Sequence, residues 1–194
     1  MKRKLPLAVE RVVSDTRIAQ AKGGYDFLSN VKYAASCRRG CAHCCYHPFL
    51  ISLPEGILLY RYLVDHGKWN LELRQRVMVA ATQVDGVPYE MWLLGKIPCP
   101  LLGVDRLCGA YEARPHRCRV TFSTGEPSEC DPHRLSSLTA LVPSAEAELE
   151  FQRGVQTRLR KVGAVGVMMS VAKALLQAEA IDKGVLDLRE AEYA

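Results

Sequence analysis

The apolar and polar residues of the chain alternate mostly at the spacing of amphipathic helices. Ser52-Leu53-Pro54-Glu55 has the pattern of a capping box with proline in the first helical turn, and it predicts a helix over residues 53–66. Gly67 would end this helix. Asn70 is a candidate N-cap for a second helix that continues to about Gln83.

The two ends of the chain carry further helical patterns. Residues 7–35 are amphipathic, but Gly23-Gly24 interrupts them, which predicts a short helix, a turn and a second segment. Pro143-Ser144 opens a helix with acidic residues in its first turns and basic residues in its last, in agreement with the helix dipole. A final helix is expected over residues 164–180. Its apolar stripe is interpreted as core packing and consists of Val165, Met168, Met169, Ala172, Leu175 and Leu176.

Between Pro88 and Pro132 the periodicity is lost, because prolines, glycines and cysteines interrupt it. So long an irregular stretch is unusual in a compact domain unless metal ligation holds it together. We therefore predict a mainly α fold, a small single helical domain with an irregular, cysteine-rich metal-binding region. Its parts would be a basic N-terminal arm (1–36), a cysteine-cluster metal-binding domain (37–134) and a C-terminal helical pair (135–194) that packs on the same domain.

Charge and hydropathy are those of a soluble protein. The formal net charge is +5, but nine basic and only three acidic residues fall within residues 1–39, so the excess belongs to the N-terminal arm. We interpret this arm as a solvated segment rather than a nucleic-acid-binding surface, because its charges are not interleaved with aromatic residues that would stack on bases. The longest apolar run, Val162 to Met169, is too short to span a membrane, and no secretion signal is readable. A cytoplasmic protein is expected.

Eight cysteines are the unusual feature of the composition. In a reducing compartment they are expected to be thiolate ligands or reactive thiols rather than disulfides. Four thiols in nine residues form the first group, and neighbouring thiolates are stable together only when a cation neutralises them. This group is Cys37, Cys41, Cys44 and Cys45. The second group lies within the proline-rich region, where the fold would have to bring its members together. It is Cys99, Cys108, Cys118 and Cys130.

Other interpretations of the cysteines stay open. The second group could pack as isolated small hydrophobic residues. The first could be a reactive dithiol or a redox sensor, since Arg38 and Arg39 would lower the pKa of its thiols. The spacing Cys37-x3-Cys41-x2-Cys44 also equals the signature with which radical S-adenosylmethionine enzymes hold a four-iron four-sulfur cluster. The chain has no series of strand-helix units for their barrel, so that fold is not expected.

The two groups together resemble the YkgJ-type cysteine-cluster family, which is described as zinc- or iron-chelating and has the motif C-x(2–3)-C-x2-C-C. The first group matches that core, and Glu55 corresponds to the glutamate of the following helix. Residues 99–102 match the family's C-P-hydrophobic-Leu, residues 108–119 match its C-x-x-Y-x-x-R-P-x-x-C-R, and Cys130 matches a trailing cysteine. The resemblance covers about residues 37–130 and implies that the eight cysteines bind zinc or iron.

The resemblance extends to flagellin lysine-N-methylase, whose similar cysteine cluster implies a four-iron four-sulfur cluster and S-adenosylmethionine as candidate cofactors. The chain has no glycine-rich strand-turn-helix for the latter. Arg114 and Arg119 flank Cys118 and are expected to bind the cofactor indirectly, by donating N–H groups to thiolate or sulfide sulfur. Tyr111 is expected to be a core aromatic residue with a satisfied hydroxyl. Of the histidines that could replace a cysteine as zinc ligand, the best placed are His47 and His116, ahead of His43 and His133.

The sequence therefore predicts a metal-binding cysteine-cluster protein, with a four-iron four-sulfur cluster as the leading hypothesis. One alternative is a structural zinc-binding module for a protein or nucleic-acid partner, in which two zinc ions use all eight cysteines. Another is an S-adenosylmethionine-dependent protein lysine methyltransferase. Whether the protein is an enzyme stays open at this stage.

Overall fold

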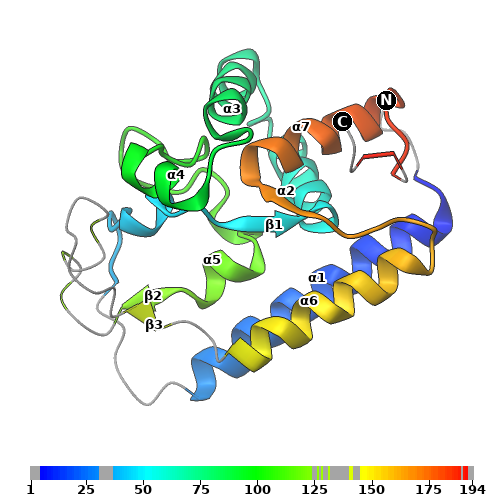
Figure 1. Ribbon diagram of the computed structural model, residues 1–194, viewed down its shortest axis with the longest axis horizontal. Coiled ribbons are helices and arrows are strands. Elements are labelled where there is room, and N and C mark those ends of the chain that lie inside the picture. Colours follow the sequence, from blue (N-terminus) through cyan, green and yellow to red (C-terminus); the bar gives the residue numbers. More distant parts are fainter. Residues whose placement is uncertain are drawn as a thin grey trace.

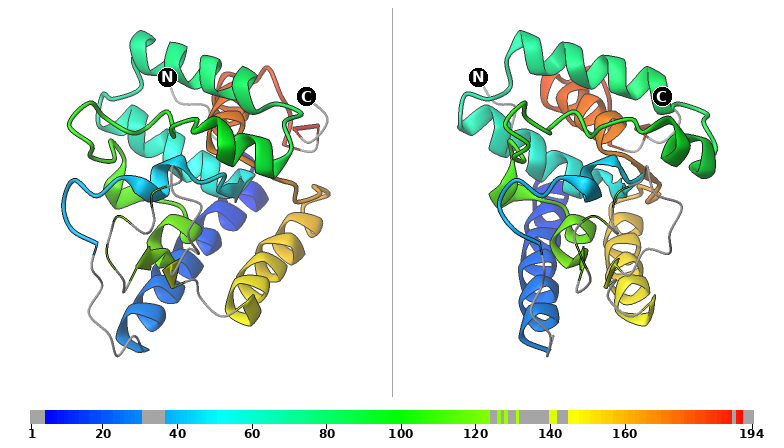
Figure 2. Two further views of the ribbon diagram at one scale, coloured as in Figure 1. Left: turned by 60° about the vertical axis from the view of Figure 1, so that its left-hand side comes forward. Right: turned by 90° about the vertical axis from the view of Figure 1, so that its left-hand side faces the viewer.

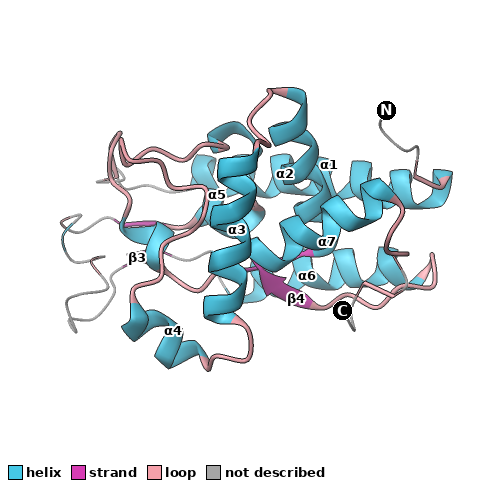
Figure 3. Ribbon diagram, turned by 90° about the horizontal axis from the view of Figure 1, so that it is seen from above, coloured by secondary structure: helices cyan, strands magenta, loops and turns pink. Residues whose placement is uncertain are grey.

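The computed structural model describes residues 5–30, 37–123, 126, 128, 131, 140–141, 145–188 and 190–191. Its helices, in chain order, are α1 (Leu7–Asn30), the 3₁₀ helix η1 (His43–Tyr46), α2 (Leu53–Asp65), α3 (Leu71–Val84), α4 (Tyr89–Gly95), the 3₁₀ helix η2 (Tyr111–Ala113), α5 (His116–Val120), α6 (Ala145–Arg160) and α7 (Val171–Lys183). The strands are β1 (Leu50–Ser52), β2 (Phe122–Ser123), β3 (Ala140–Leu141) and β4 (Met168–Ser170). The predicted mainly α domain is confirmed, and the strands are a small part of it (Figure 3).

Helices α2 and α7 pack against each other at the centre of the hydrophobic core. Leu59 and Leu63 of α2 and Leu175 of α7 are almost completely buried there. Helix α3 lies across this pair and contacts α7, as Figure 2 shows. Helices α1 and α6 lie side by side and antiparallel, and α1 also packs on α2 (Figure 1). No described helix combines the length and the apolar character that a membrane span requires.

The helix boundaries read from capping residues are confirmed. The Glu55 carboxylate reaches back to the N-cap Ser52 of α2 in a capping box, and α2 ends just before Gly67. The side chain of Asn70 accepts a hydrogen bond from the Leu73 N–H at the start of α3. These ends are set by local chemistry, which is why the sequence alone locates them.

The predicted break in the first helix is wrong, because α1 continues through Gly23-Gly24 to Asn30. A Cβ atom at Gly23 would lie 2.7 Å from Cε1 of His116, so this glycine allows α5 to approach α1 closely rather than forming a turn. The interpretation as a solvated arm is also wrong for this helix, since Val12 and Val13 are buried in the core. Domain boundaries at residues 36 and 134 stay a prediction.

The last helix begins later than predicted, at Val171 rather than at residue 164. Residues 168–170 form β4, which pairs antiparallel with β1 so that Leu50 lies opposite Ser170. Ser170 then caps α7 by accepting the Lys173 N–H at 3.1 Å. The expected packing role is confirmed for Met169, which is buried. Val165 precedes both β4 and α7 and is 57% exposed.

We expect Gly56→Ala to destabilise the protein by about 1–3 kcal/mol through overpacking. A Cβ atom at Gly56 in α2 would lie 2.8 Å from Cβ and 2.9 Å from the carbonyl oxygen of Ala174 in α7, so the central helix pair would have to move apart. Urea denaturation measures the effect. Gly154→Ala in α6 is the matched control and should stabilise by about 0.5–1 kcal/mol, because its Cβ would meet only the flexible end of Arg158. Equal effects of the two substitutions would contradict the close α2–α7 packing.

Candidate metal centre

Seven cysteines, all those that the structure describes, line one cavity of about 580 Å³. They come from both sequence groups: Cys37, Cys41, Cys44, Cys45, Cys99, Cys108 and Cys118. None of them forms a disulfide. The eighth predicted ligand, Cys130, lies outside the described residues. The fold thus brings together thiols that are far apart in the chain, as metal ligation requires.

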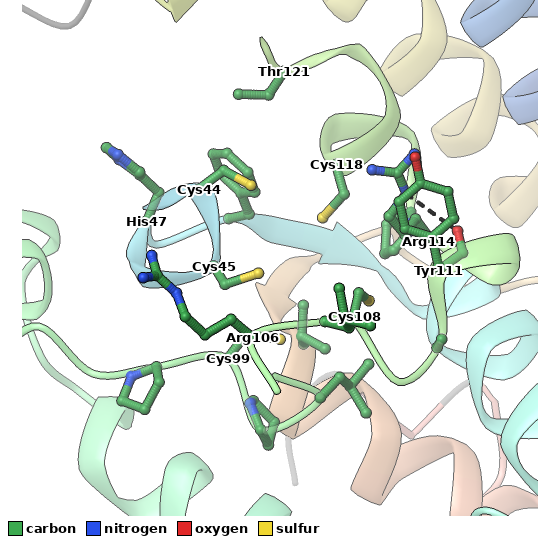
Figure 4. A pocket seen from close by; sticks show the side chains of 18 of the residues that line it. Cys44, Cys45, His47, Cys99, Arg106, Cys108, Tyr111, Arg114, Cys118 and Thr121 are labelled. Atoms are coloured by element: carbon green, nitrogen blue, oxygen red, sulfur yellow. Dashed lines mark hydrogen bonds between the residues drawn. The ribbon is translucent and has the colours of Figure 1, made fainter. Parts of the chain in front are cut away.

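The two sequence groups meet through backbone hydrogen bonds rather than through regular structure. Cys44 and Cys45 lie on η1, and the Cys99 N–H donates to the Cys45 carbonyl at 2.7 Å. Cys99 and Cys108 lie at the two ends of a tight loop, in which Leu102 pairs with Cys108 and the Gly109 N–H donates to Leu101 O at 2.8 Å. Figure 4 shows the thiols of η1 and of this loop around one space, with Cys118 of α5 on a further side.

Helix α5 is tied to the start of α2 by the buried carboxylate of Glu55, which is 3% exposed. Its Oε1 accepts the His116 N–H and the Gln20 side-chain N–H, both at 2.8 Å. Its Oε2 accepts the N–H of Ser52 at 2.9 Å and the hydroxyl of Ser52 at 2.8 Å. One side chain therefore holds α1, the β1–α2 junction and the segment that carries Cys118.

Burial is the main influence on the thiols deepest in the site. It raises the pKa of Cys99 to about 12 and also raises the pKa values of Cys108 and Cys118, because a thiolate loses its hydration there. The charge of the Cys44 thiolate raises all three further. Without a metal these thiols are therefore neutral at physiological pH.

Cys44 is the exception among these thiols. The Cys45 S–H donates a hydrogen bond to the Cys44 sulfur, which together with the charge of Arg114 outweighs burial and lowers the pKa of Cys44 to about 7. The same hydrogen bond raises the pKa of Cys45 far above its ordinary value. We call Cys44, Cys45, Cys99, Cys108 and Cys118 the inner cysteines, since the ionisation of Cys44 affects each of the others.

The two arginines next to Cys118 lie differently. Arg114 lines the cavity, and its charge lowers the pKa of Cys44 and opposes the rise at Cys108 and Cys118. Its guanidinium lies 3.8 Å from the ring centre of Tyr111 and donates from Nε to the Tyr111 carbonyl at 3.1 Å. The prediction that Tyr111 is a core residue is wrong, because it is 62% exposed and covers the arginine instead.

Arg119 holds the backbone of residues 112–114 from outside the cavity. It does not line the cavity, and its Nε donates to the Arg114 carbonyl at 2.7 Å, while a second nitrogen donates to the Glu112 carbonyl. Burial lowers the pKa of Arg119. Its contacts therefore fix the backbone of Arg114 rather than reaching sulfur.

The histidines are not arranged as the sequence suggested. His116 is buried away from the cavity, where its ring stacks on Phe151 of α6 at 4.0 Å and Nε2 lies 3.7 Å from a carboxylate oxygen of Glu148. His47 does line the cavity, but its ring points away from the sulfur atoms in Figure 4. His43 is not part of the lining, and His133 lies outside the described residues.

Arg106 is the cavity residue that sequence reasoning missed. It lies in the turn between Cys99 and Cys108 and adopts a left-handed backbone conformation with φ 61°, which is unusual for a residue other than glycine. No sequence motif marks it, because neither the turn nor its place in the cavity lining can be inferred from local spacing. Among the described residues, no three cysteine, histidine, aspartate or glutamate side chains form a group that could hold a single metal ion as they stand.

Comparison with known proteins gives one match. The model of the CxxCxxCC family, with the description "Putative zinc- or iron-chelating domain", matches residues 36–139. This span includes all eight cysteines and every lining residue of the cavity except Ser170, Val171 and Ala172. No curated protein and no solved structure matches the chain.

We expect Glu55→Gln to destabilise the protein by about 3 kcal/mol, because the amide N–H₂ cannot accept the hydrogen bonds that one carboxylate oxygen now receives. Urea denaturation of the wild type and the variant measures the loss. Glu72→Gln on the exposed side of α3 is the matched control and should change stability by less than about 0.5 kcal/mol. A loss no larger than that of the control would show that the Glu55 network does not hold the fold.

In metal-free protein, alkylation by iodoacetamide should begin at Cys44. Since only the thiolate reacts, the rate at Cys44 should rise with pH and reach half of its maximum at about pH 7, while Cys99 and Cys118 stay unmodified there. Peptide mass spectrometry after short labelling at several pH values measures each site. Modification of Cys118 before Cys44 would contradict the described hydrogen bond and burial.

Proposed function

Because the chain belongs to the CxxCxxCC family, whose domain is described as zinc- or iron-chelating, we propose that it is a metal-binding protein that holds one four-iron four-sulfur cluster. The observation that carries this proposal is the gathering of both cysteine groups around a single cavity. The inner cysteines supply the ligands, with one more thiol than a cluster needs.

The spread of the thiols supports a cluster over a single ion. Zinc bound by cysteine needs sulfur atoms about 2.3 Å from one point. In the described part of the chain no three candidate ligands form such a group, although seven cysteines line the same cavity. The backbone bond from Cys99 to Cys45 also brings the two sequence groups of cysteines to one place. A larger inorganic group suits donors that are arranged in this way.

The chain's residues would act on the centre through charge and burial. Metal binding must remove the protons of the buried thiols, so the affinity for metal should rise with pH. Arg114 offsets part of the negative charge that results. The buried apolar side chains of Leu59 and Leu101 line the inner side of the cavity and lower the polarity around the centre. No observation favours methyl transfer, since the described strands pair only in antiparallel fashion, and we do not propose it.

Anaerobically purified protein should contain about four iron and four sulfide per chain and show a brown iron–sulfur absorption. Cys118→Ser should remove most of the iron, because Cys118 is buried among the inner cysteines. Cys37→Ser is the matched control and should retain iron, because Cys37 is exposed and its sulfur accepts the Ser123 N–H at 3.4 Å.

Elemental analysis and absorption spectra of the wild type, Cys118→Ser and Cys37→Ser test the assignment of the cluster to the inner cysteines. A colourless protein with two zinc ions per chain would replace the cluster by the structural zinc module. Loss of iron in Cys37→Ser but not in Cys118→Ser would instead place the cluster on the Cys37-x3-Cys41-x2-Cys44 segment alone. Either result would overturn the assignment to the inner cysteines.

A further inference from the structure

The cavity that holds the cysteines is also lined by four arginines, and among the described residues no aspartate, glutamate or lysine lines it. The arginines are Arg38, Arg39, Arg106 and Arg114. None of the four forms an ion pair with any part of the chain that the structure describes. Within the described part of the chain, four positive charges without a carboxylate partner therefore line one cavity.

The metal centre does not account for all of this charge. A centre with a charge of 2+ on four thiolates carries a net charge of about −2, whether it is zinc or an oxidised cluster. The four arginines exceed it by about two charges. Arg114 is already shared with the thiols, since it lowers the pKa of Cys44. The excess lies with the arginines on the outer side, all of which are exposed.

Arg106 is held in place at some energetic expense. Its left-handed φ of 61° is a strained backbone conformation for a residue with a Cβ. The Arg106 N–H donates to Gly103 O at 3.0 Å, and the Gly103 N–H donates to Leu107 O at 2.8 Å, so the turn fixes this conformation. Glycine would relieve the strain at this position. Strained backbone conformations occur frequently at binding sites, and this one lies in the lining of the cavity.

The inner part of the cavity is apolar. Leu59 of α2, Ala80 of α3 and Leu101 line it and belong to the hydrophobic core. Its volume of about 580 Å³, part of which the metal centre would occupy, is in the usual range for sites that bind small organic molecules. The space therefore offers apolar contact at one end and guanidinium groups at the other.

We propose that this cavity binds a small organic oxyanion with an apolar body, a carboxylate or a phosphate ester, beside the metal centre. Arg106 holds the oxyanion through charge-assisted hydrogen bonds. Arg38 and Arg39, which follow Cys37 in the sequence, line the same cavity and add positive charge. The apolar body lies against the core residues. The inference rests on the proposed metal centre, which forms one wall of the site.

The test is calorimetric titration of anaerobically prepared, metal-loaded protein with octanoate and with octyl phosphate. One of these anions should bind at one site per chain, and which one binds more tightly identifies the head group. Octyltrimethylammonium has the same chain with the opposite charge and should not bind. Equal binding of the cation, or no binding of either anion to protein whose metal content is confirmed, would overturn the proposal.

Variants assign the site within the chain. Arg106→Gln should weaken binding of the anion about tenfold or more, and Arg106→Lys should restore part of the affinity by restoring the charge. Arg153→Gln on the exposed side of α6 is the matched control and should bind within about twofold of wild type, because Arg153 is not part of the cavity. Equal affinities of Arg106→Gln and Arg153→Gln would overturn the role of Arg106.

Metal analysis of every titrated sample separates the two proposals. Protein that contains the cluster but binds no anion refutes only the oxyanion site. Protein that lacks metal when purified refutes the metal centre that forms its wall. The two failures therefore have different signatures in the same experiment.

Discussion

Four hydrogen bonds converge on the Glu55 carboxylate, and the arrangement of the cavity depends on them. Hydrophobic burial packs α2 against α7, but it is not directional and does not define where a loop lies to within an ångström. The carboxylate is directional. It ties Ser52, which follows the η1 segment, to His116, which lies two residues before Cys118. One buried side chain therefore connects the β1–α2 junction to the helix that carries Cys118.

The burial that protects the site also works against its ionisation. Cys99 and Cys118 lie where thiolates are poorly solvated, so a cation must accompany their deprotonation. The chain supplies part of that charge itself through Arg114. The ring of Tyr111 packs on its guanidinium, and Arg119 donates a hydrogen bond to its carbonyl. In this way the irregular region between α4 and β2 is ordered by backbone hydrogen bonds and by charge, rather than by long helices.

The sequence was sufficient wherever structure is determined locally. The capping box at Ser52 and the N-cap at Asn70 placed two helix starts correctly, since each depends on neighbouring side chains. It failed where distant segments meet. Gly23 looks like a helix break but is a contact with His116, and β4 is invisible because its partner β1 lies more than a hundred residues away. The match of the family model confirms the resemblance that the cysteine motifs suggested.

For the site itself, spacing identified the thiols but not their grouping. The cysteines read as two sets along the chain, whereas the fold mixes them through the bond from Cys99 to Cys45. No sequence motif indicated Arg106, because its role depends on a turn conformation and on the cysteines and arginines that line the cavity with it. Long-range contacts of this kind follow from packing and cannot be inferred from local patterns.

The positions of the arginines also determine how metal and oxyanion would influence each other. The charge of Arg114 favours the thiolate forms of Cys44 and Cys118. An anion that paired with Arg114 would make these thiols harder to deprotonate and would lower the affinity for metal. By linkage, metal would then weaken anion binding to the same extent. Arg106 lies in the turn at the outer side, where it can hold an anion without drawing on Arg114. Separating the two charges lets both groups occupy one cavity, which argues for Arg106 rather than Arg114 as the principal contact of the oxyanion.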